Sequence, residues 1–322
     1  SWGLDEDGNG TLIGVRAAKD VLILRPHIHD NGTASSNEPG CNAITASGVD
    51  DANLPAQRVW IVDGTFYRNR GDHVRIGRPT AGGGADIPAF IYIARNLMWE
   101  DPSRPDNAIG ENATDIKLSA DVVFSQNVAY GFRSTPTSPG ECVVVHDNAT
   151  RVWILDNDLS ACQTGAAVTS GTVVRILGNF IHDTTQRAIR ATPNVTSAHN
   201  TIRRSPIGIY SSSNPGTVLG NILHETPTPY SFSGGGSVAQ NMTTGDPLFV
   251  NAASDTLQAS SPAKDAASEG SAYAEFQTLY GINIRNGRPA GVTWDQGSYE
   301  IPSGGGPPNA PGPPSIQVEV VP

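Results

Sequence analysis

An asparagine recurs at nearly constant spacing in the second half of the chain, each time at the end of a short apolar run. The runs are WILDN, RILGN, TSAHN and TVLGN, and their asparagines are Asn157, Asn179, Asn200 and Asn221, separated by 22, 21 and 21 residues. This period is too short for a repeat of paired helices, and the runs lack the pattern of a leucine-rich repeat. It fits one coil of three short strands, each stacked in parallel on the same strand of the next coil, about 4.8 Å away. The sequence therefore predicts an all-β solenoid, a parallel β-helix with coils of 21–22 residues.

Asparagine has two properties that suit this position. It tolerates left-handed backbone at a turn, and its amide can form a hydrogen-bonded ladder with the same residue in the next coil. Earlier copies of the repeat, such as those near Trp60 and Asn96, are looser. The wider gaps between these copies predict loops at 31–40, 49–56, 78–88 and 134–140, and loops on a rigid scaffold are where binding grooves are usually built.

The composition agrees with short strands and narrows the classes of function. The 322 residues include 35 glycines and 24 prolines, and only 16% are charged, while apolar residues at helical spacing occur only at 271–279. The net charge of −10 argues against a nucleic-acid partner, and no apolar run is long enough to span a membrane. Cys142 and Cys162 lie about one repeat apart, which fits either a disulfide between coils or a ladder of buried thiols; Cys41 is the third cysteine.

Three segments near the C-terminus, DPLFVN (246–251), LQASSPAKD (257–265) and DQGSYE (295–300), resemble the closing segment of secreted bacterial members of the pectate-lyase-like superfamily. The resemblance covers about residues 11–300 and implies a right-handed parallel β-helix, a secreted or cell-surface location, and calcium as the cofactor. It is weak for activity, because the superfamily includes lyases, hydrolases, epimerases, phage spikes and adhesins. We expect coils over 1–245, a closing segment over 246–301, and a Pro/Gly-rich linker with a terminal strand over 302–322.

Charged residues recur on one strand of the predicted coil. Since side chains alternate between the core and the surface, aligning these strands predicts an outward column of Arg16, Arg75, Lys117, Val145 or His146, Arg190 and Tyr210. In an acidic protein, such a column indicates a groove for an acidic polysaccharide. Arg75 and Lys117 are expected roughly 5 Å apart on adjacent coils, where the like charge would lower the lysine pKa.

This arrangement predicts a polysaccharide lyase that acts by β-elimination. Lys117 is the candidate base and Arg75 the cation that neutralises the uronate carboxylate; related β-helix lyases use similar pairs, as the resemblance implies. Arg16, Arg190, Tyr210 and His146 are the candidate substrate-binding residues, and Asp115 is a candidate metal ligand. Asp115 could instead pair with Lys117, which would leave a solvated charge ladder without catalytic function.

Two other interpretations follow from the sequence. The first is a structural or adhesive subunit that assembles into a surface fibre through its tail, with Ile316, Val318 and Val320 alternating in the terminal strand. Its partners would be neighbouring copies of the chain. The second, a hydrolase of the polygalacturonase type, is disfavoured because the chain lacks paired Asp residues near a Gly-His signature. His29, His182 and His224 share one position of the repeat, which favours a structural role.

Overall fold

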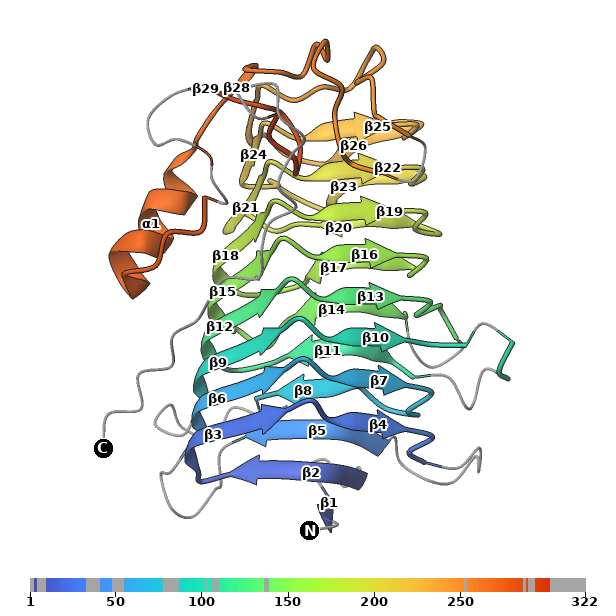
Figure 1. The fold of residues 1–322 in the computed structure, drawn as a ribbon, viewed down its shortest axis with the longest axis vertical. Coiled ribbons are helices and arrows are strands. Elements are labelled where there is room, and N and C mark those ends of the chain that lie inside the picture. Colours follow the sequence, from blue (N-terminus) through green and yellow to red (C-terminus); the bar gives the residue numbers. More distant parts are fainter. Residues whose placement is uncertain are drawn as a thin grey trace.

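Three parallel sheets run along the long axis of the molecule and make up most of it, and the strands of successive coils are stacked in each sheet (Figure 1). The computed structural model describes residues 3–4, 10–32, 41–47, 55–77, 87–101, 103–105, 110–135, 139–251, 254–285, 288 and 293–301. Much of the four predicted loops, at 33–40, 48–54, 78–86 and 136–138, lies outside these residues. The predicted tail at 302–322 also lies outside them, and so do Ile316, Val318 and Val320.

Each of the three sheets takes one strand from each successive coil. Sheet A contains, in order, β1 (Gly3–Leu4), β2 (Gly10–Arg16), β5 (Cys41–Ser47), β8 (Val74–Ile76), β11 (Asn112–Ile116), β14 (Glu141–Val145), β17 (Thr164–Val168), β20 (Arg187–Arg190), β23 (Ile207–Ser211) and β26 (Thr228–Phe232). Sheet B contains β3 (Lys19–Leu24), β6 (Gln57–Val62), β9 (Ala89–Ala94), β12 (Ala120–Ser125), β15 (Thr150–Leu155), β18 (Thr172–Leu177), β21 (Val195–Ala198), β24 (Thr217–Leu219) and β27 (Ser237–Ala239). Sheet C contains β4 (His27–His29), β7 (Thr65–Tyr67), β10 (Leu97–Trp99), β13 (Val128–Tyr130), β16 (Asp158–Ser160), β19 (Phe180–His182), β22 (Thr201–Arg203) and β25 (Ile222–His224).

This topology is a right-handed parallel β-helix, which confirms the fold predicted from the repeat. Strands of neighbouring coils pair in parallel throughout the three sheets, apart from β1, which pairs antiparallel with β2. In the part of the chain that the structure describes, no helix has both the length and the apolar character that a membrane span requires.

Columns of apolar side chains fill the interior of the solenoid. Alternation along each strand directs every second side chain inward, and the parallel register places equivalent residues directly above one another. One column on sheet B is wholly buried over five coils and consists of Ile61, Ile93, Phe124, Ile154 and Ile176. Such columns tie the repeat length to the fold, because an inserted residue would turn the apolar set outward.

The asparagine ladder is confirmed and extends further than the sequence indicated. Side-chain amides donate from each coil to the next at 2.8–3.1 Å along Asn96, Asn127, Asn157, Asn179, Asn200, Asn221 and Asn241. One part of the prediction is wrong: the left-handed residue is the one before each asparagine. Its φ lies between 51° and 69° at Arg95, Gln126, Asp156, Gly178, His199, Gly220 and Gln240. At each turn, therefore, one residue adopts the left-handed conformation and the asparagine that follows it forms the ladder.

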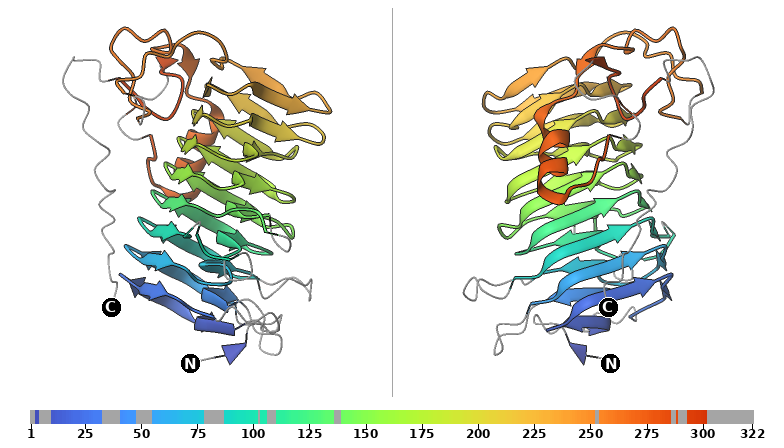
Figure 2. Two further views of the ribbon diagram at one scale, coloured as in Figure 1. Left: turned by 90° about the vertical axis from the view of Figure 1, so that its right-hand side faces the viewer. Right: turned by 60° about the vertical axis from the view of Figure 1, so that its left-hand side comes forward.

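The closing segment folds back along the outer face of sheet B (Figure 2). The helix α1 (Ser271–Tyr280) confirms the helical spacing seen at 271–279, and it packs its buried Tyr273 and Phe276 against Trp153 and Leu177 of the sheet. Beyond the coils, β28 (Ala267–Ser268) pairs antiparallel with β29 (Thr293–Trp294). Burying the two aromatic rings of α1 contributes on the order of 2–3 kcal/mol each to docking.

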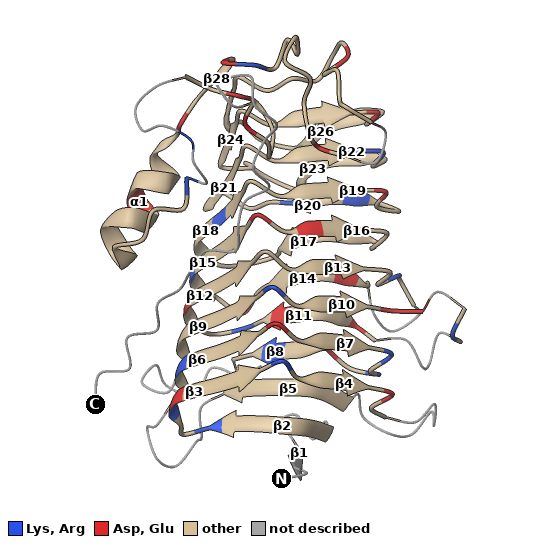
Figure 3. Cartoon of the chain, viewed as in Figure 1, with Lys and Arg blue, Asp and Glu red and all other residues tan. Residues whose placement is uncertain are grey.

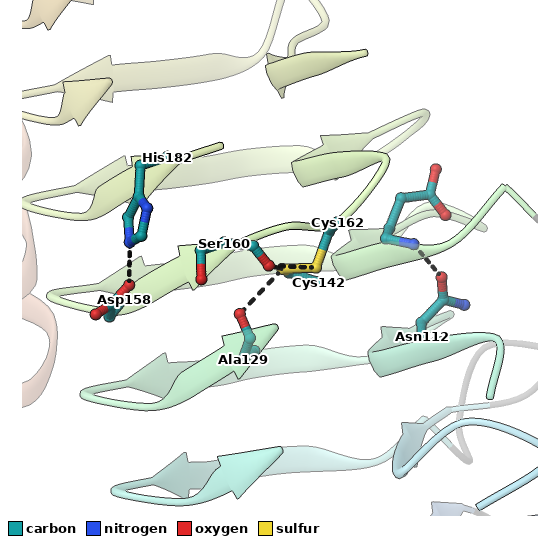
Figure 4. The surroundings of a disulfide bond; sticks show 8 residues. Asn112, Ala129, Cys142, Asp158, Ser160, Cys162 and His182 are labelled. Carbon is teal, nitrogen blue, oxygen red and sulfur yellow. Dashed lines mark hydrogen bonds and ion pairs between the residues drawn. A yellow bond between two sulfur atoms is a disulfide. The ribbon is translucent and has the colours of Figure 1, made fainter. Parts of the chain in front are cut away.

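A disulfide joins two neighbouring coils (Figure 4). Cys142 lies in β14 and Cys162 follows the end of β16, and their Cα atoms lie 5.8 Å apart. The structure therefore selects the disulfide from the two alternatives that the spacing of Cys142 and Cys162 had left open.

The repeated histidines lie at one position of sheet C, as predicted. Pairing along the sheet places His29, Tyr67, Trp99, Tyr130, Ser160, His182, Arg203 and His224 in one column. The rings of Tyr67 and Trp99 stack 5.0 Å apart, nearly parallel. This column is consistent with stacking between coils as the role of the position.

Candidate functional site

Charged side chains gather on the outer face of sheet A, where Figure 3 shows basic and acidic segments on β8 and β11. We call this set the β11 cluster; it consists of Asp72, Arg75, Asp115, Lys117, Glu141 and His146. Four of its members are at most 5% exposed, whereas the side chains of Lys117 and His146 are 16% and 25% exposed. A ligand in solution therefore meets Lys117 and His146 first.

The register of sheet A differs from the predicted one by two residues at Lys117. Arg75 on β8 lies opposite Asp115 on β11, and Lys117 lies two residues further along, beyond the end of that strand. The prediction that Arg75 and Lys117 face each other is therefore wrong. The coils are adjacent as expected, but alternation leaves both 115 and 117 on the outer face, so the sequence could not distinguish them.

Arg16 and His146 fall into the row of Lys117. Arg16 pairs with Ser47, and the backbone N–H groups of Lys117 and His146 each donate to the preceding coil one residue past the strand end. Arg16 is separated from Lys117 by two intervening coils, a distance of about 14 Å, so it does not join the β11 cluster. His146 does join it, and Val145, the other candidate for the column, is buried in the core.

Asp115 is the centre of the β11 cluster. One of its oxygens, Oδ1, accepts a 2.6 Å hydrogen bond from Nε2 of His146, and Oδ2 lies 3.1 Å from Nζ of Lys117. Burial would raise the pKa of Asp115, but the hydrogen bond from His146 and the charges of His146, Lys117 and Arg75 outweigh it and hold the pKa below its usual range. Asp115 is thus ionised and organises the cations around it. This confirms the Asp115–Lys117 pair that the sequence allowed.

His146 has a carboxylate at each ring nitrogen. Its Nδ1 lies 3.2 Å from Asp147, opposite the bond to Asp115. Burial lowers the pKa of His146, but the hydrogen bond and charge of Asp115 exceed this effect, so the pKa is raised. The carboxylates on both sides of the ring favour its protonated form, which carries a positive charge.

Glu141 has a pKa close to neutral pH. Burial is the main cause that raises its pKa to about 7; Arg190 lowers it, and the negative charges of Asp115 and Glu111 raise it further. Sequence reasoning missed Glu141. The available signal was its alignment with Asn112 in the preceding coil, whose side-chain oxygen accepts from the Glu141 backbone N–H at 3.0 Å.

Asp72 provides a second carboxyl group with a perturbed pKa. It is buried, and this burial, together with the negative charges of Asp115 and Glu111, raises its pKa well above the usual range. Its Oδ1 accepts a hydrogen bond from the side chain of Asn112 at 2.9 Å. Asp72 therefore lies next to Asn112, which is in the same row as Glu141, at the edge of the β11 cluster.

Arg190 and Tyr210 lie further along sheet A. They face each other on β20 and β23, as predicted. The row of Asp115 runs through Val144 and Ala167 to Arg190, so Arg190 is three coils from Asp115. The structure thus divides the predicted column into two groups, the β11 cluster and a second group on β20 and β23.

Calcium does not fit the donors of the β11 cluster. Both carboxylate oxygens of Asp115 are bonded to cationic side chains, so a metal ion there would have to displace Lys117 or His146. Among the described residues, no group of three or more His, Cys, Asp or Glu side chains is arranged to hold a metal ion.

The fold and the site together define a right-handed parallel β-helix with a charged outer face on one sheet. No family model matches the chain, and no curated protein matches it. Among solved structures, it is similar to the periplasmic alginate epimerase AlgG, with 10% identity and a TM-score of 0.42 over 73% of this chain and 63% of AlgG. It is also similar to the pectate lyase Pel9A, with 11% identity and a TM-score of 0.42 over 91% of this chain and 96% of Pel9A. The chain thus spans less than two thirds of AlgG, and the proposals below depend on the side chains of sheet A.

Proposed function

We propose that this protein is an extracellular carbohydrate-active β-helix that binds an acidic polysaccharide along sheet A and cleaves it by β-elimination at the β11 cluster. One observation carries the proposal: the carboxyl group of Glu141, with a pKa of about 7, lies in the same charged cluster as three cations, Arg75, Lys117 and His146. A group that gains and loses a proton near neutrality, beside fixed positive charge, suits proton removal next to a carboxylate.

The proposed roles follow from the chemistry of a uronate. Lys117 and His146, the two accessible cations, bind the uronate carboxylate together with Arg75, so that charge developing on that carboxylate is stabilised. Glu141 takes the proton from the carbon next to the carboxylate. The bond from the neighbouring carbon to the glycosidic oxygen then breaks, a carbon–carbon double bond forms, and the leaving oxygen gains a proton from solvent.

Lys117 remains the alternative base. Its ammonium group is held by Asp115 at 3.1 Å, which suits a binding cation better than a proton acceptor. The two assignments differ in what a lysine-to-arginine change does, because arginine retains the charge and cannot act as the base.

The experiment measures the ultraviolet absorbance of unsaturated product from polygalacturonate, alginate and other polyuronates. We expect Glu141→Gln to lower kcat by about 100-fold or more, Lys117→Ala to raise KM, and Lys117→Arg to retain most of the turnover. Lys264→Gln, which removes one positive charge from an exposed position outside sheet A, serves as the control. If Lys117→Arg is inactive while Glu141→Gln is active, Lys117 is the base. The absence of unsaturated product from every polyuronate would refute β-elimination.

The disulfide supports the proposed location. Bonds such as Cys142–Cys162 persist in oxidising compartments and are rare in reducing ones. We therefore propose that the protein functions outside the cytoplasm.

Assembly of copies into a fibre is the second candidate function. Its support is the exposure of large apolar side chains on the N-terminal coils of sheet B, where Leu22, Leu24 and Phe90 are 56%, 53% and 53% exposed. Light scattering after size-exclusion chromatography tests this on the whole chain, on a chain without residues 304–322, and on Leu22→Ser/Leu24→Ser. A monomer at all concentrations in the intact chain would contradict it.

A further inference from the structure

Two arginines on β20 have no acidic partner in the part of the chain that the structure describes. Arg187 and Arg190 are both partly exposed. Within the described residues, no carboxylate lies at ion-pair distance from either guanidinium, and the Nε atom of Arg187 is buried without a hydrogen-bond partner. Several arginines elsewhere on the surface are paired with a carboxylate, for example Arg95 with Asp63 and Arg151 with Asp121. The β20 pair is therefore a local excess of unneutralised positive charge on an acidic protein.

The ring of Tyr210 lies against Arg187. The guanidinium carbon of Arg187 lies 4.5 Å from the ring centroid, and Arg190 lies opposite Tyr210 in the register of β20 and β23. Stacking on an aromatic ring orients a guanidinium and leaves its in-plane N–H groups available for a planar or tetrahedral oxyanion. The arrangement is preformed, so an anion would bind without the cost of ordering a flexible side chain.

The electrostatics favour an anion at this position. Burial and the neighbouring charge of Arg190 lower the pKa of Arg187. The charge of Arg190 acts on Glu141, but a pKa of about 7 leaves that carboxyl group only partly ionised at neutral pH. Two cations held together without a fixed counter-charge are stabilised by a ligand that brings one.

The distance to the β11 cluster sets the length of that ligand. Asp115, Val144, Ala167 and Arg190 are successive members of one row, so Arg190 lies about 14 Å from Asp115 along the solenoid axis. The two side chains between them, Val144 and Ala167, are small and uncharged. A pyranose residue is about as long as one coil is high, so a sugar chain along sheet A would place about one residue on each coil.

We propose that Arg187, Arg190 and Tyr210 form a second anion subsite, which binds a carboxylate of an acidic oligosaccharide about three sugar residues from the one held by Lys117 and His146. This inference rests on the proposed function and adds to it the length of substrate that sheet A recognises. Chains of four or more uronates engage both positions, and a dimer engages only one.

The test compares binding of oligouronates of defined length by isothermal titration calorimetry. The probes are the dimers and hexamers of galacturonate and of mannuronate. The variant is Arg187→Gln/Arg190→Gln, and the control is Lys19→Gln/Lys264→Gln, which removes the same two charges from exposed positions outside sheet A. We expect the arginine variant to bind a hexamer about tenfold more weakly or worse and a dimer as the wild type does, with the control unchanged. Tyr210→Leu, which removes the ring but no charge, should show the same length dependence and replaces the double variant if that one does not fold.

The failure of the subsite and the failure of the proposed function give different results. If the wild type binds neither hexamer, the proposed function is wrong and the subsite falls with it. If the wild type binds a hexamer and the arginine variant binds it equally well, or loses dimer and hexamer alike, only the subsite is wrong. A sulfated hexamer that binds the wild type more tightly than both uronate hexamers, and depends more on the two arginines, would overturn the assignment to a carboxylate.

Discussion

Replacing Asn179 by alanine tests whether the asparagine ladder holds the coils together. The Oδ1 atom of Asn179 accepts from the backbone and side-chain nitrogens of Asn157 at 3.0 and 2.8 Å. Its Nδ2 donates to Ile154, Leu177 and Asn200 at 2.9, 3.1 and 2.9 Å. The residue is wholly buried, so water cannot replace these bonds.

The magnitude follows from what the substitution leaves unpaired. The buried N–H of Asn157 loses its acceptor, which costs about 1–3 kcal/mol, and the remaining lost bonds cost about 1 kcal/mol each. Since some acceptors retain other donors, such as the Leu177 carbonyl that still accepts from Asp156, we expect a total of about 3–5 kcal/mol.

The matched control is Asn241→Ala at the end of the same ladder. Asn241 accepts the same two bonds from Asn221 at 2.8 Å, yet it is only partly buried. Water can replace its bonds, so we expect a loss of about 1 kcal/mol. Urea unfolding followed by circular dichroism gives both values, provided that each transition remains two-state. If the two variants are equally destabilised, or if Asn179→Ala costs less than about 1 kcal/mol, burial of the ladder does not govern its contribution.

Three further predictions concern groups whose burial the structure defines. The pKa of Glu141 in the folded protein, about 7, exceeds its usual value of 4.5, so the stability linked to its proton is fully present below about pH 4.5 and is lost as pH rises through 7. The change is about 3 kcal/mol, and Glu141→Gln should remove it from the pH dependence of urea unfolding. Glu100→Ala should cost about 3–5 kcal/mol, because it leaves wholly buried His73 without the carboxylate that lies 2.9 Å from its Nε2; a thermal melt matching the wild type would contradict this. Reducing Cys142–Cys162, which closes a sequence separation of 20 residues, should cost about 3 kcal/mol, measured by unfolding with and without reductant.

The fold was predictable because every coil repeats the same local requirement. Asn157, Asn179, Asn200 and Asn221 each accept a hydrogen bond from a backbone N–H of the preceding coil, so the residue type recurs at the period of the coil. The conformation of the turn was harder to predict. The left-handed residue before each asparagine varies among Asp156, Gly178 and others. Because several residue types can adopt this φ, no single residue type marks the position in the sequence.

The site was only partly predictable, because its chemistry depends on contacts between coils. The sequence identified Lys117, Arg75 and His146, but the loops between strands have variable length, so it could not decide whether residue 115 or 117 faces Arg75. Glu141 could not be predicted as a site residue for a different reason. Its pKa reflects burial and charges contributed by residues as distant in sequence as Glu111 and Arg190, and no local pattern encodes that environment.

The closing segment changes how a solenoid of this kind can come apart. In a stack whose repeats contact only their neighbours, the ends fray one coil at a time. Here Tyr280 of α1 donates to Asp121 on β12 at 2.8 Å, Glu275 accepts from Arg175 on β18 at 2.8 Å, and the carbonyl of Ser268 lies 3.0 Å from a ring nitrogen of His199, next to β21. One segment is thus bonded to the coils of β12 and β18, which are separated by the coil of β15, and to the end of β21. Opening the last coil displaces the closing segment and so breaks its bonds to β12 and β18. We therefore expect the C-terminal half of the molecule to unfold as a single cooperative unit.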